Sequence, residues 1–331
     1  MQHILAIDAG GTHTRAVRAD AAGHCLGYGV SGPGNPISAG TEGALASFTE
    51  AALQASGGGN VPPFARIVFA MAGHGAGLPL ERISASLAAV GIHGPVSVES
   101  DLLAMFCSGT PSPDGYALAA GTGSVAARIV GHRLDRVADG TGWLLGDAGS
   151  GFWIGRRIAR AAVADLDGLG PATALTDLLL AELGLGRTGG RATGRPRELL
   201  QLIEALYALR PVQLSRFAPL AFASRADAVA ASILRDAAAE LAASLRAVRE
   251  EGVTGPLTIG GSVLSALLDT GALNAEALGA GGAGGGDGGS PIRVRDGAVG
   301  AVVLALVRGG VPVDQGVFDR IVADVERLRA P

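Results

Sequence analysis

The first stretch of the chain alternates between apolar runs and glycine-rich turns. Residues 4–7 (ILAI) form a short apolar run that ends at Asp8, a GGT turn follows, and an alternating run begins at Thr14. This spacing predicts strand, tight turn, strand, and residues 24–30 continue the pattern as a third strand. A helix is expected over 41–56, because Thr41 at its start is a favourable N-cap residue and Glu42 follows in the first turn.

Strands and helices then alternate. The sequence predicts a buried strand at 65–73, a helix at 79–90 and a strand at 95–101 that ends in acidic residues. Such alternation implies parallel strands joined by right-handed crossovers. The first hundred residues therefore predict three antiparallel strands followed by βαβ units.

The same pattern restarts at residue 116. Residues 116–136 repeat the order found at 4–27: an apolar strand, a Gly/Thr turn, an alternating strand, a Gly-His pair and a third strand. An internal repeat predicts two copies of one α/β unit, whose Gly/Thr hairpins can face each other across a cleft. The SGTPSPDG turn marks the boundary between the two domains, 1–110 and 111–331.

Helical patterns dominate the second half of the chain. Five are expected before the next strand, at about 150–166, 171–184, 197–209, 212–223 and 225–251. A strand, a Gly-Gly turn and a helix start are expected at 256–264, a last strand at 291–294, and helices at 297–308 and 314–329. The low-complexity segment 279–290 predicts a surface loop.

Composition excludes several classes of protein. The chain is 48% hydrophobic and 17% charged, which indicates a globular protein. Its net charge of −4 and the lack of a basic tract argue against a nucleic-acid partner. No apolar run reaches the roughly 18 residues of a membrane span. No export signal precedes the first strand, so a cytoplasmic location is expected.

The numbers of cysteine and lysine residues exclude several kinds of site. Cys25 and Cys107 are too few and too widely spaced for a disulfide framework or a metal site. All 26 basic residues are arginine. The absence of lysine excludes a lysine base, a Schiff base or a P-loop lysine.

The first turn carries the candidate chemistry. Gly10 and Gly11 lack Cβ atoms, so backbone N–H groups can approach an anion, and Thr12 and Thr14 add hydroxyl donors. Asp8 at the strand end can orient a hydrated cation on that anion. The turn thus predicts a cradle for a nucleotide phosphate with Mg²⁺. An ordinary hairpin with a Gly-Gly turn is the alternative.

Five motifs in a fixed order carry a resemblance to a known family. They are DAGGTHT (8–14), a strand ending in Asp101, AAGTGS (119–124), GWLLGDAGSGFWIG (142–155) and TIGGSVL (258–264). The chain resembles the N-acetylglucosamine kinases and the wider group of BadF/BadG/BcrA/BcrD ATPases. The resemblance implies an α/β fold of two duplicated ribonuclease-H-like (actin-like ATPase) domains around a central cleft. It also implies that the helix at 314–329 packs on the N-terminal domain.

The resemblance implies a divided nucleotide site. Asp8 would hold Mg²⁺ through water, and the sugar kinase would use ATP. The first phosphate loop would comprise Gly10, Gly11 and Thr12, with the Thr14 hydroxyl nearby. The second phosphate loop and the adenosine contact would comprise Gly121, Thr122, Gly123, Ser124, Gly260, Gly261 and Ser262. Such a cradle positions the γ-phosphate and disperses its charge, as phosphoryl transfer requires.

Asp101 resembles the family's catalytic base, which accepts the proton of the attacking sugar hydroxyl. The alternative is that it caps the helix beginning at Leu102. The sugar contacts implied by the resemblance are Asn35, Asp101, Thr122, Gly140, Thr141 and Asp147. Without the resemblance, Asp147 could be a helix N-cap, and Asn35 could be an ordinary turn residue.

Three positions depart from the family pattern. His13 stands where lysine is usual, Ala148 replaces a glutamate that neighbours the sugar pocket, and Trp143 replaces a different residue. These departures leave the identity of the sugar open, including whether it is N-acetylated.

The sequence leaves three candidate functions. The leading hypothesis is a kinase that phosphorylates the 6-hydroxyl group of N-acetylglucosamine or glucosamine, a small-molecule sugar substrate. The alternative is an activator-type ATPase of the benzoyl-CoA reductase group, which would need cluster-binding cysteines. A non-catalytic sugar sensor is the third. A homodimer is expected from the resemblance.

Overall fold

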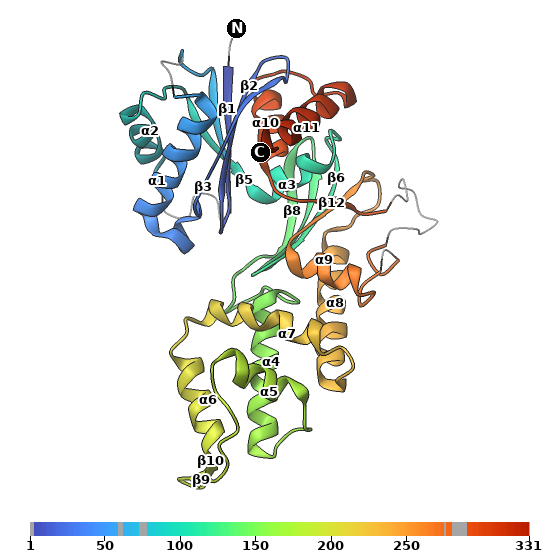
Figure 1. Ribbon diagram of the computed structural model, residues 1–331. Helices are drawn as coiled ribbons and strands as arrows, with labels where there is room; N and C mark the ends of the chain where they lie inside the picture. The colour runs from blue at the N-terminus through green and yellow to red at the C-terminus, as the bar shows by residue number, and fades with distance from the viewer. Residues whose placement is uncertain (1–2, 59–61, 73–77, 275, 280–289, 331) are drawn as a thin grey trace.

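The structure is a computed structural model that describes residues 3–58, 62–72, 78–274, 276–279 and 290–330. Most of the loop expected at 279–290 lies outside the described residues. Two β-sheets lie in the upper part of Figure 1, and a group of helices extends below them.

The first half of the chain forms the first sheet and three helices. Its elements are β1 (His3–Ala9), β2 (Thr14–Asp20), β3 (Cys25–Ser31), α1 (Pro36–Ser56), β4 (Arg66–Met71), α2 (Leu80–Ala89), β5 (Val96–Ser100) and α3 (Asp101–Gly109).

The remainder forms the second sheet, the helical extension and the C-terminal helices. Its first elements are β6 (Gly115–Ala120), β7 (Ser124–Val130), β8 (Arg133–Asp139), α4 (Gly151–Asp167), α5 (Ala174–Glu182), β9 (Arg191–Ala192), β10 (Arg195–Pro196) and α6 (Arg197–Tyr207). They are followed by η1 (Pro211–Phe217), α7 (Ala218–Ala223), α8 (Ala228–Val248), β11 (Leu257–Gly260), α9 (Ser262–Asp269), β12 (Ile292–Val294), α10 (Ala298–Arg308) and α11 (Gln315–Arg329).

The two sheets have the same topology. The first has the strand order β3-β2-β1-β4-β5, and the second, read from its β8 edge, has the order β8-β7-β6-β11-β12. In each sheet the first three strands of the unit pair antiparallel and the last two join in parallel. The predicted fold class, two duplicated ribonuclease-H-like (actin-like ATPase) domains, is therefore confirmed.

Parallel pairing brings the ends of three strands to one edge of the first sheet. Ala9 at the end of β1 pairs with Met71 of β4, and Met71 pairs with Ser100 of β5. Asp8 and Asp101, far apart in sequence, consequently lie at the same edge. Open α/β sheets place their chemistry at this carboxyl edge.

Helices cover both faces of the first sheet. Leu5 and Ile7 of β1 point into a core shared with α1 and α2, whereas Ile4 and Ala6 point into a core shared with α3, α10 and α11. The second core also takes in Ala117, Ala127 and Ile129 from the second sheet, so α3 and α10 lie between the two sheets. Within this layer the α3 and α10 backbones touch, because a Cβ at Gly300 would lie 1.8 Å from the Ala104 carbonyl oxygen.

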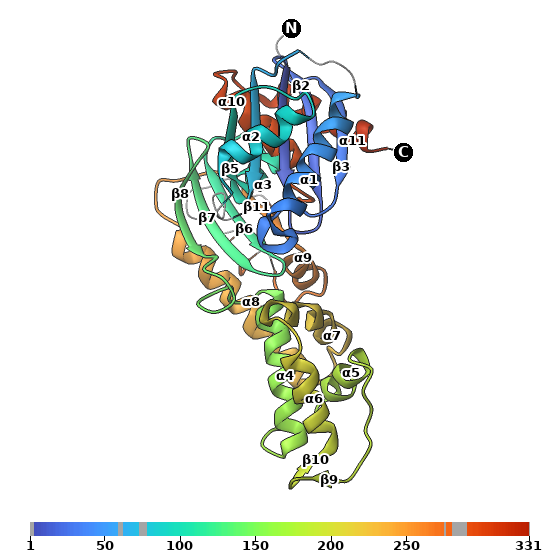
Figure 2. The ribbon, with the colours of Figure 1, turned by 90° about the vertical axis from the view of Figure 1, so that its left-hand side faces the viewer.

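The other face of the second sheet packs against the helical region. Tyr116, Leu118 and Ile259 share a core with residues of α4, α5 and α8. Figures 1 and 2 show α4 to α7 extending away from both sheets, with the short β9–β10 hairpin at the far tip. The sequence pattern gave no sign of that hairpin, whose strands have two residues each.

Two helix predictions differ from the structure in informative ways. The helix expected over 41–56 begins instead at Pro36, a residue whose fixed φ suits a first helical position, and is interrupted by Gly40 (φ 72°). The segment expected as one helix at 212–223 is a 3₁₀ turn followed by α7, with prolines at 211 and 219 near the start of each. Proline lacks the N–H group that a continuous helix would need.

No single helix among the described residues is both long and apolar enough to cross a bilayer, and one helix pair, Pro211–Ala223 with Ala228–Val248, meets the length and composition test only when joined across a 117° bend.

Candidate functional site

The turn predicted to be the first phosphate loop is tight and exposed. The Gly10 N–H group donates a hydrogen bond to the His13 carbonyl oxygen at 3.0 Å, which closes the turn between β1 and β2. Gly11, Thr12 and His13 are exposed, and His13 Nδ1 lies 3.2 Å from Thr12 Oγ1. The tip of the hairpin is therefore accessible to an anion.

The Asn35 loop is fastened to this turn. The N–H groups of Gly34 and Asn35 both donate to the Gly10 carbonyl oxygen, at 3.0 and 3.1 Å. Thr14 is fully buried, and its hydroxyl donates to the Gly32 carbonyl oxygen at 3.0 Å. Thr14 thus holds the Asn35 loop against the hairpin, a role that the sequence reasoning did not assign to it.

Asp8 is a buried carboxylate at the end of β1. Its Oδ2 atom accepts a hydrogen bond from the Gly297 N–H group at 3.1 Å and lies 3.6 Å from Arg15 Nη1. Burial raises the pKa of Asp8 to about 7, and the nearby charges of Asp296 and Asp101 act in the same direction, against Arg15 and the Gly297 N–H group.

This environment fits the expected magnesium role. Mg²⁺ is usually held through one or two carboxylates, substrate phosphates and water. The buried Asp8 carboxyl, with its raised pKa, is a group whose ionised form a bound cation would favour. The described residues include no cluster of three or more His, Cys, Asp or Glu side chains arranged to hold a metal ion directly.

Asp101 is the first residue of α3 and is partly buried. Its Oδ1 atom accepts a hydrogen bond from the Leu102 N–H group at 2.8 Å, and Ser100 Oγ accepts from the same group at 3.2 Å. The capping interaction considered in the sequence analysis is thus present and shared with Ser100. The influence of Asp101 on the pKa of Asp8 places both acids in one electrostatic environment.

The second phosphate loop joins β6 to β7. The Gly121 N–H group donates to the Gly123 carbonyl oxygen at 2.9 Å, and the Gly121 and Thr122 carbonyl oxygens accept from the first turn of α4. A Cβ at Gly261 would lie 2.3 Å from the Ala120 carbonyl oxygen, so the turn before α9 packs directly on this loop. Glycine is also needed at 261 because φ is +95°.

Asp147 lies against the second phosphate loop. Its Oδ1 atom accepts a hydrogen bond from the Ser124 N–H group at 3.3 Å, and a Cβ at Gly123 would lie 2.8 Å from that oxygen. Burial raises the pKa of Asp147, Asp139 raises it further, and the Ser124 N–H group opposes the shift. Asp147 has φ 58°, so a tight turn orients its side chain.

Asp139 builds that turn, and sequence reasoning missed it. Its carboxylate accepts hydrogen bonds from the Asp147 N–H group at 2.6 Å and the Ala148 N–H group at 2.8 Å. Gly140 and Thr141 follow Asp139, and both are exposed. The buried Ser124 hydroxyl donates to the Ala148 carbonyl oxygen at 2.8 Å, so Ser124 supports the turn.

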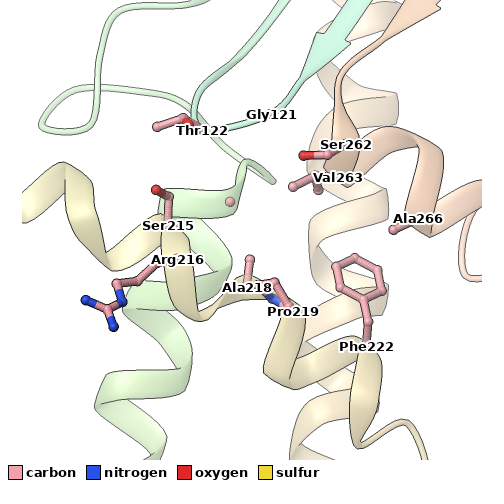
Figure 3. A pocket seen from close by; sticks show the side chains of 11 residues that line it. Gly121, Thr122, Ser215, Arg216, Ala218, Pro219, Phe222, Ser262, Val263 and Ala266 are labelled. Atoms are coloured by element: carbon pink, nitrogen blue, oxygen red, sulfur yellow. The ribbon is translucent and has the colours of Figure 1, made fainter. Parts of the chain in front are cut away.

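The adenosine contact expected at the Gly-Gly turn adjoins a cavity of about 440 Å³ (Figure 3). Four segments enclose it: the loop between β6 and β7, the first residue of α4, the start of α9, and the η1–α7 segment. The lining residues are Gly121, Thr122, Gly151, Ser215, Arg216, Ala218, Pro219, Phe222, Ser262, Val263 and Ala266. This size and the apolar walls suit a nucleoside.

Phe222 forms one wall of this cavity, and its ring faces α9 and Ala266 in Figure 3. The Arg216 guanidinium points away from the cavity and pairs with Glu182 at 3.3 Å. Of the adenosine residues expected from sequence, Ser262 lines the cavity. Gly260 instead lies beneath α3, where a Cβ would be 2.4 Å from Met105 Sδ.

The two cysteines are both buried, Cys25 in β3 and Cys107 in α3. Burial raises the pKa of each thiol to about 12. A cluster ligand must be a thiolate, which these environments disfavour.

Two of the three departures from the family pattern, Trp143 and Ala148, lie near Asp147 in the sequence, and the third, His13, lies on the first hairpin. Trp143 is 42% exposed and makes an edge contact with Phe152 at 5.9 Å between ring centroids. Leu144 and Leu145, which follow it, are exposed as well. Ala148 contributes only backbone contacts to the turn, through its N–H group and carbonyl oxygen.

Comparison with known proteins places the chain among nucleotide-dependent enzymes. The model of the BadF/BadG/BcrA/BcrD ATPase family matches residues 5–305. By sequence, the N-acetyl-D-glucosamine kinase of Dictyostelium discoideum is 32% identical over 148 residues. That match spans 43% of this chain and 43% of the relative, less than half of either.

Two solved structures share the fold over nearly the whole chain. A provisionally assigned N-acetylglucosamine kinase from Chromobacterium violaceum has a TM-score of 0.68 and 23% identity, covering 92% of this chain and 99% of its own. Another from Porphyromonas gingivalis has a TM-score of 0.64 and 20% identity, covering 94% of this chain and 100% of its own.

Proposed function

This chain belongs to the BadF/BadG/BcrA/BcrD ATPase family, and we propose that it is an ATP-dependent sugar kinase that phosphorylates the 6-hydroxyl group of N-acetylglucosamine or glucosamine. One observation carries the proposal: the carboxyl edge of the first sheet gathers Asp8 and Asp101, and the Asn35 loop is bonded to the hairpin that follows Asp8. The proposed phosphate loop, the proposed base and the loop proposed to contact the sugar therefore adjoin. The kinase name of the Dictyostelium relative supports the sugar class.

The nucleotide would occupy the cavity on the second domain. Its base and ribose would lie between Phe222 and the start of α9, and its phosphates would extend along Gly121 and Thr122. Their far end would meet the first phosphate loop at Gly10 and Gly11. Backbone N–H groups in such turns bind phosphate oxygens and need no lysine, which this chain lacks.

Asp101 would act as the base. Its carboxylate accepts the proton of the sugar hydroxyl as that oxygen forms a bond to the γ-phosphorus. The bond from the γ-phosphorus to the bridging oxygen breaks, and ADP leaves with the electron pair. Asp8 would hold Mg²⁺ through water, and the cation, when bound, neutralises charge on the phosphate oxygens.

Asn35, Asp101, Thr122, Gly140, Thr141 and Asp147 are the proposed sugar contacts. The raised pKa of Asp147 reflects a partly desolvated carboxyl group, such as a pocket that selects for hydroxyl groups provides. The two Asp139 hydrogen bonds fix the turn that presents it. A fixed carboxylate discriminates between sugars because a missing hydroxyl leaves it unpaired.

The test is an ADP-release assay with ATP and Mg²⁺ across N-acetylglucosamine, glucosamine, N-acetylmannosamine, N-acetylmuramic acid and glucose. Turnover with either of the first two supports the proposal, and ADP release that no sugar stimulates contradicts it. The product's ³¹P spectrum identifies the acceptor. A phosphate on the 6-oxygen couples to two methylene protons, whereas a phosphate on a ring hydroxyl couples to one.

Two matched variants separate catalysis from capping. Asp101→Asn keeps an oxygen that can accept from Leu102 N–H but removes the base, and we expect a loss of about 100-fold or more in kcat. Ser100→Ala removes the other cap acceptor and leaves the base, so its kcat should stay near that of the wild type. A kcat for Asp101→Asn near that of the wild type and of Ser100→Ala would assign Asp101 to capping alone.

A further inference from the structure

A row of alternating charges runs from the C-terminal helix to the first phosphate hairpin. Arg329 Nη2 of α11 lies 2.6 Å from Asp296 Oδ1, Arg15 Nε lies 3.3 Å from Asp296 Oδ2, and Arg15 Nη1 lies 3.6 Å from Asp8 Oδ2. The side chains of Asp8 and Asp296 are only 8% and 6% exposed. These two carboxylates are therefore largely shielded from water. Charge interactions are stronger in such an environment than in water.

Asp296 is held next to Asp8 by the backbone. It directly precedes Gly297, whose N–H group donates to Asp8 Oδ2 and whose Cα is so close that a Cβ would lie 2.8 Å from Asp8 Oδ1. Asp296 Oδ1 also accepts from the Ala298 N–H group at 3.1 Å. A movement of Asp296 would therefore be transmitted to Asp8.

Arg15 is shared between two acids. Asp296 Oδ2 accepts no hydrogen bond from the described residues, so its ion pair with Arg15 at 3.3 Å is its main compensation. Asp8 competes for the same guanidinium group at 3.6 Å. How Arg15 is divided between the two acids depends on how well a second cation neutralises the Oδ1 atom of Asp296.

Arg329 supplies that neutralisation. Its guanidinium carbon lies 5.5 Å from the centre of the Tyr28 ring, and its Nη1 atom pairs with Glu326 at 2.8 Å. These contacts from β3 and α11 direct the remaining Nη2 atom onto Asp296. With the charge at 329 removed, Arg15 would be drawn towards Asp296 and away from Asp8.

We propose that Arg329 is a positioning residue for the phosphate–magnesium end of the active site: by neutralising Asp296 it keeps Arg15 shared with Asp8. The role rests on the proposed function, since it assumes that Asp8 serves a bound nucleotide. It makes α11, the last helix of the chain, a support for the nucleotide site. Supporting residues of this kind typically change metal affinity or activity by about 10–100-fold when replaced.

The test compares three variants of the full chain. Arg329→Met removes the charge but keeps an apolar stem over Tyr28, and Arg329→Lys restores a cation. Arg327→Met is the matched control, because Arg327 lies on the same helix with its side chain 63% exposed, paired with Asp324. ADP binding is measured by calorimetry over a Mg²⁺ titration, with circular dichroism to establish that each variant is folded.

We expect Arg329→Met to raise the Mg²⁺ concentration needed for half-maximal ADP binding by about tenfold or more. Arg329→Lys should recover part of that loss, and Arg327→Met should match the wild type. In the kinase assay kcat should fall while the KM for sugar stays within about twofold, because the row of charges is proposed to act on the phosphate–magnesium end of the site.

Arg329→Met and Arg327→Met variants with equal Mg²⁺ requirements would overturn the proposal. If Arg329→Met does not fold, the same comparison is made with Arg329→Gln, which also removes the charge, and a Mg²⁺ requirement equal to that of Arg327→Met overturns the proposal. The binding readout needs no sugar. A wild-type protein that binds MgADP but phosphorylates no sugar would refute the proposed kinase function and leave this test intact.

Discussion

The buried carboxyl group of Asp8 makes the stability of the protein depend on pH. Its pKa rises from an ordinary 3.8 to about 7 in the folded chain, chiefly through burial. The folded state therefore binds a proton more tightly than the unfolded state between these values. Stability from this group is complete below the unfolded pKa and is lost as pH rises through the folded pKa.

The size of the effect follows from the shift. About three pKa units at about 1.4 kcal/mol each set an upper limit of about 4 kcal/mol, of which about 2–3 kcal/mol falls between about pH 5 and about pH 8. Asp8→Asn replaces the acid with a neutral side chain of the same shape. The variant should therefore gain stability relative to the wild type by about that amount as pH rises over this range.

Urea unfolding followed by circular dichroism measures the difference at each pH. Glu204→Gln, at an exposed position on α6, is the control and should show no comparable trend. The reasoning is refuted if the difference between Asp8→Asn and the wild type is the same at both ends of the range. Added Mg²⁺ and ADP should reduce the trend in the wild type, because a bound cation favours the carboxylate.

Two further substitutions test the nucleotide cavity and the domain core. Phe222→Ala should raise the KM for ATP about tenfold, since stacking of a base on an aromatic ring contributes about 1–3 kcal/mol. Phe222→Leu should raise the KM for ATP by less. Equal KM values for both variants and the wild type would place the base elsewhere. Gly300→Ala should lower the free energy of unfolding by about 1–3 kcal/mol, because its Cβ would lie 1.8 Å from the Ala104 carbonyl oxygen. Gly186→Ala, which meets nothing within 4 Å, is its control in denaturant unfolding.

The sheet architecture could be predicted because its signal is local and occurs twice. The apolar run before Asp8, the glycine turn and the alternating strand recur at 116–136, and each strand was placed within a residue or two. Four of the five helices expected between residues 150 and 251 lie close to their predicted positions, as α4, α5, α6 and α8, whereas the segment at 212–223 is a 3₁₀ turn followed by α7. Where proline or glycine sets the backbone, as at Pro36 and Gly40, the boundaries differed.

Site residues could be predicted only where they belong to a short sequence motif whose residue types indicate a function. Glycines and acids at strand ends identified the loops around Asp8 and Asp147. Phe222 sits in a 3₁₀–α segment that reads as ordinary helix, and no sequence pattern indicates that it faces a helix starting 40 residues later. The sequence gives no sign that Asp296 and Arg329 lie near Asp8. They do so because the C-terminal segment packs against β1, although the two parts lie almost the whole chain apart.

The covering of the first sheet has a consequence for how the protein is made. Leu5 and Ile7 receive their partners, α1 and α2, soon after β1 is synthesised. Ile4 and Ala6, on the opposite face of the same strand, share their core with α3 and with α10 and α11, and the last two helices are encoded about 300 residues later. During translation at about 5–20 residues per second, that face stays without α10 and α11 for at least about 15 seconds. We expect ribosome-bound chains that stop before residue 298 to engage chaperones at this sheet.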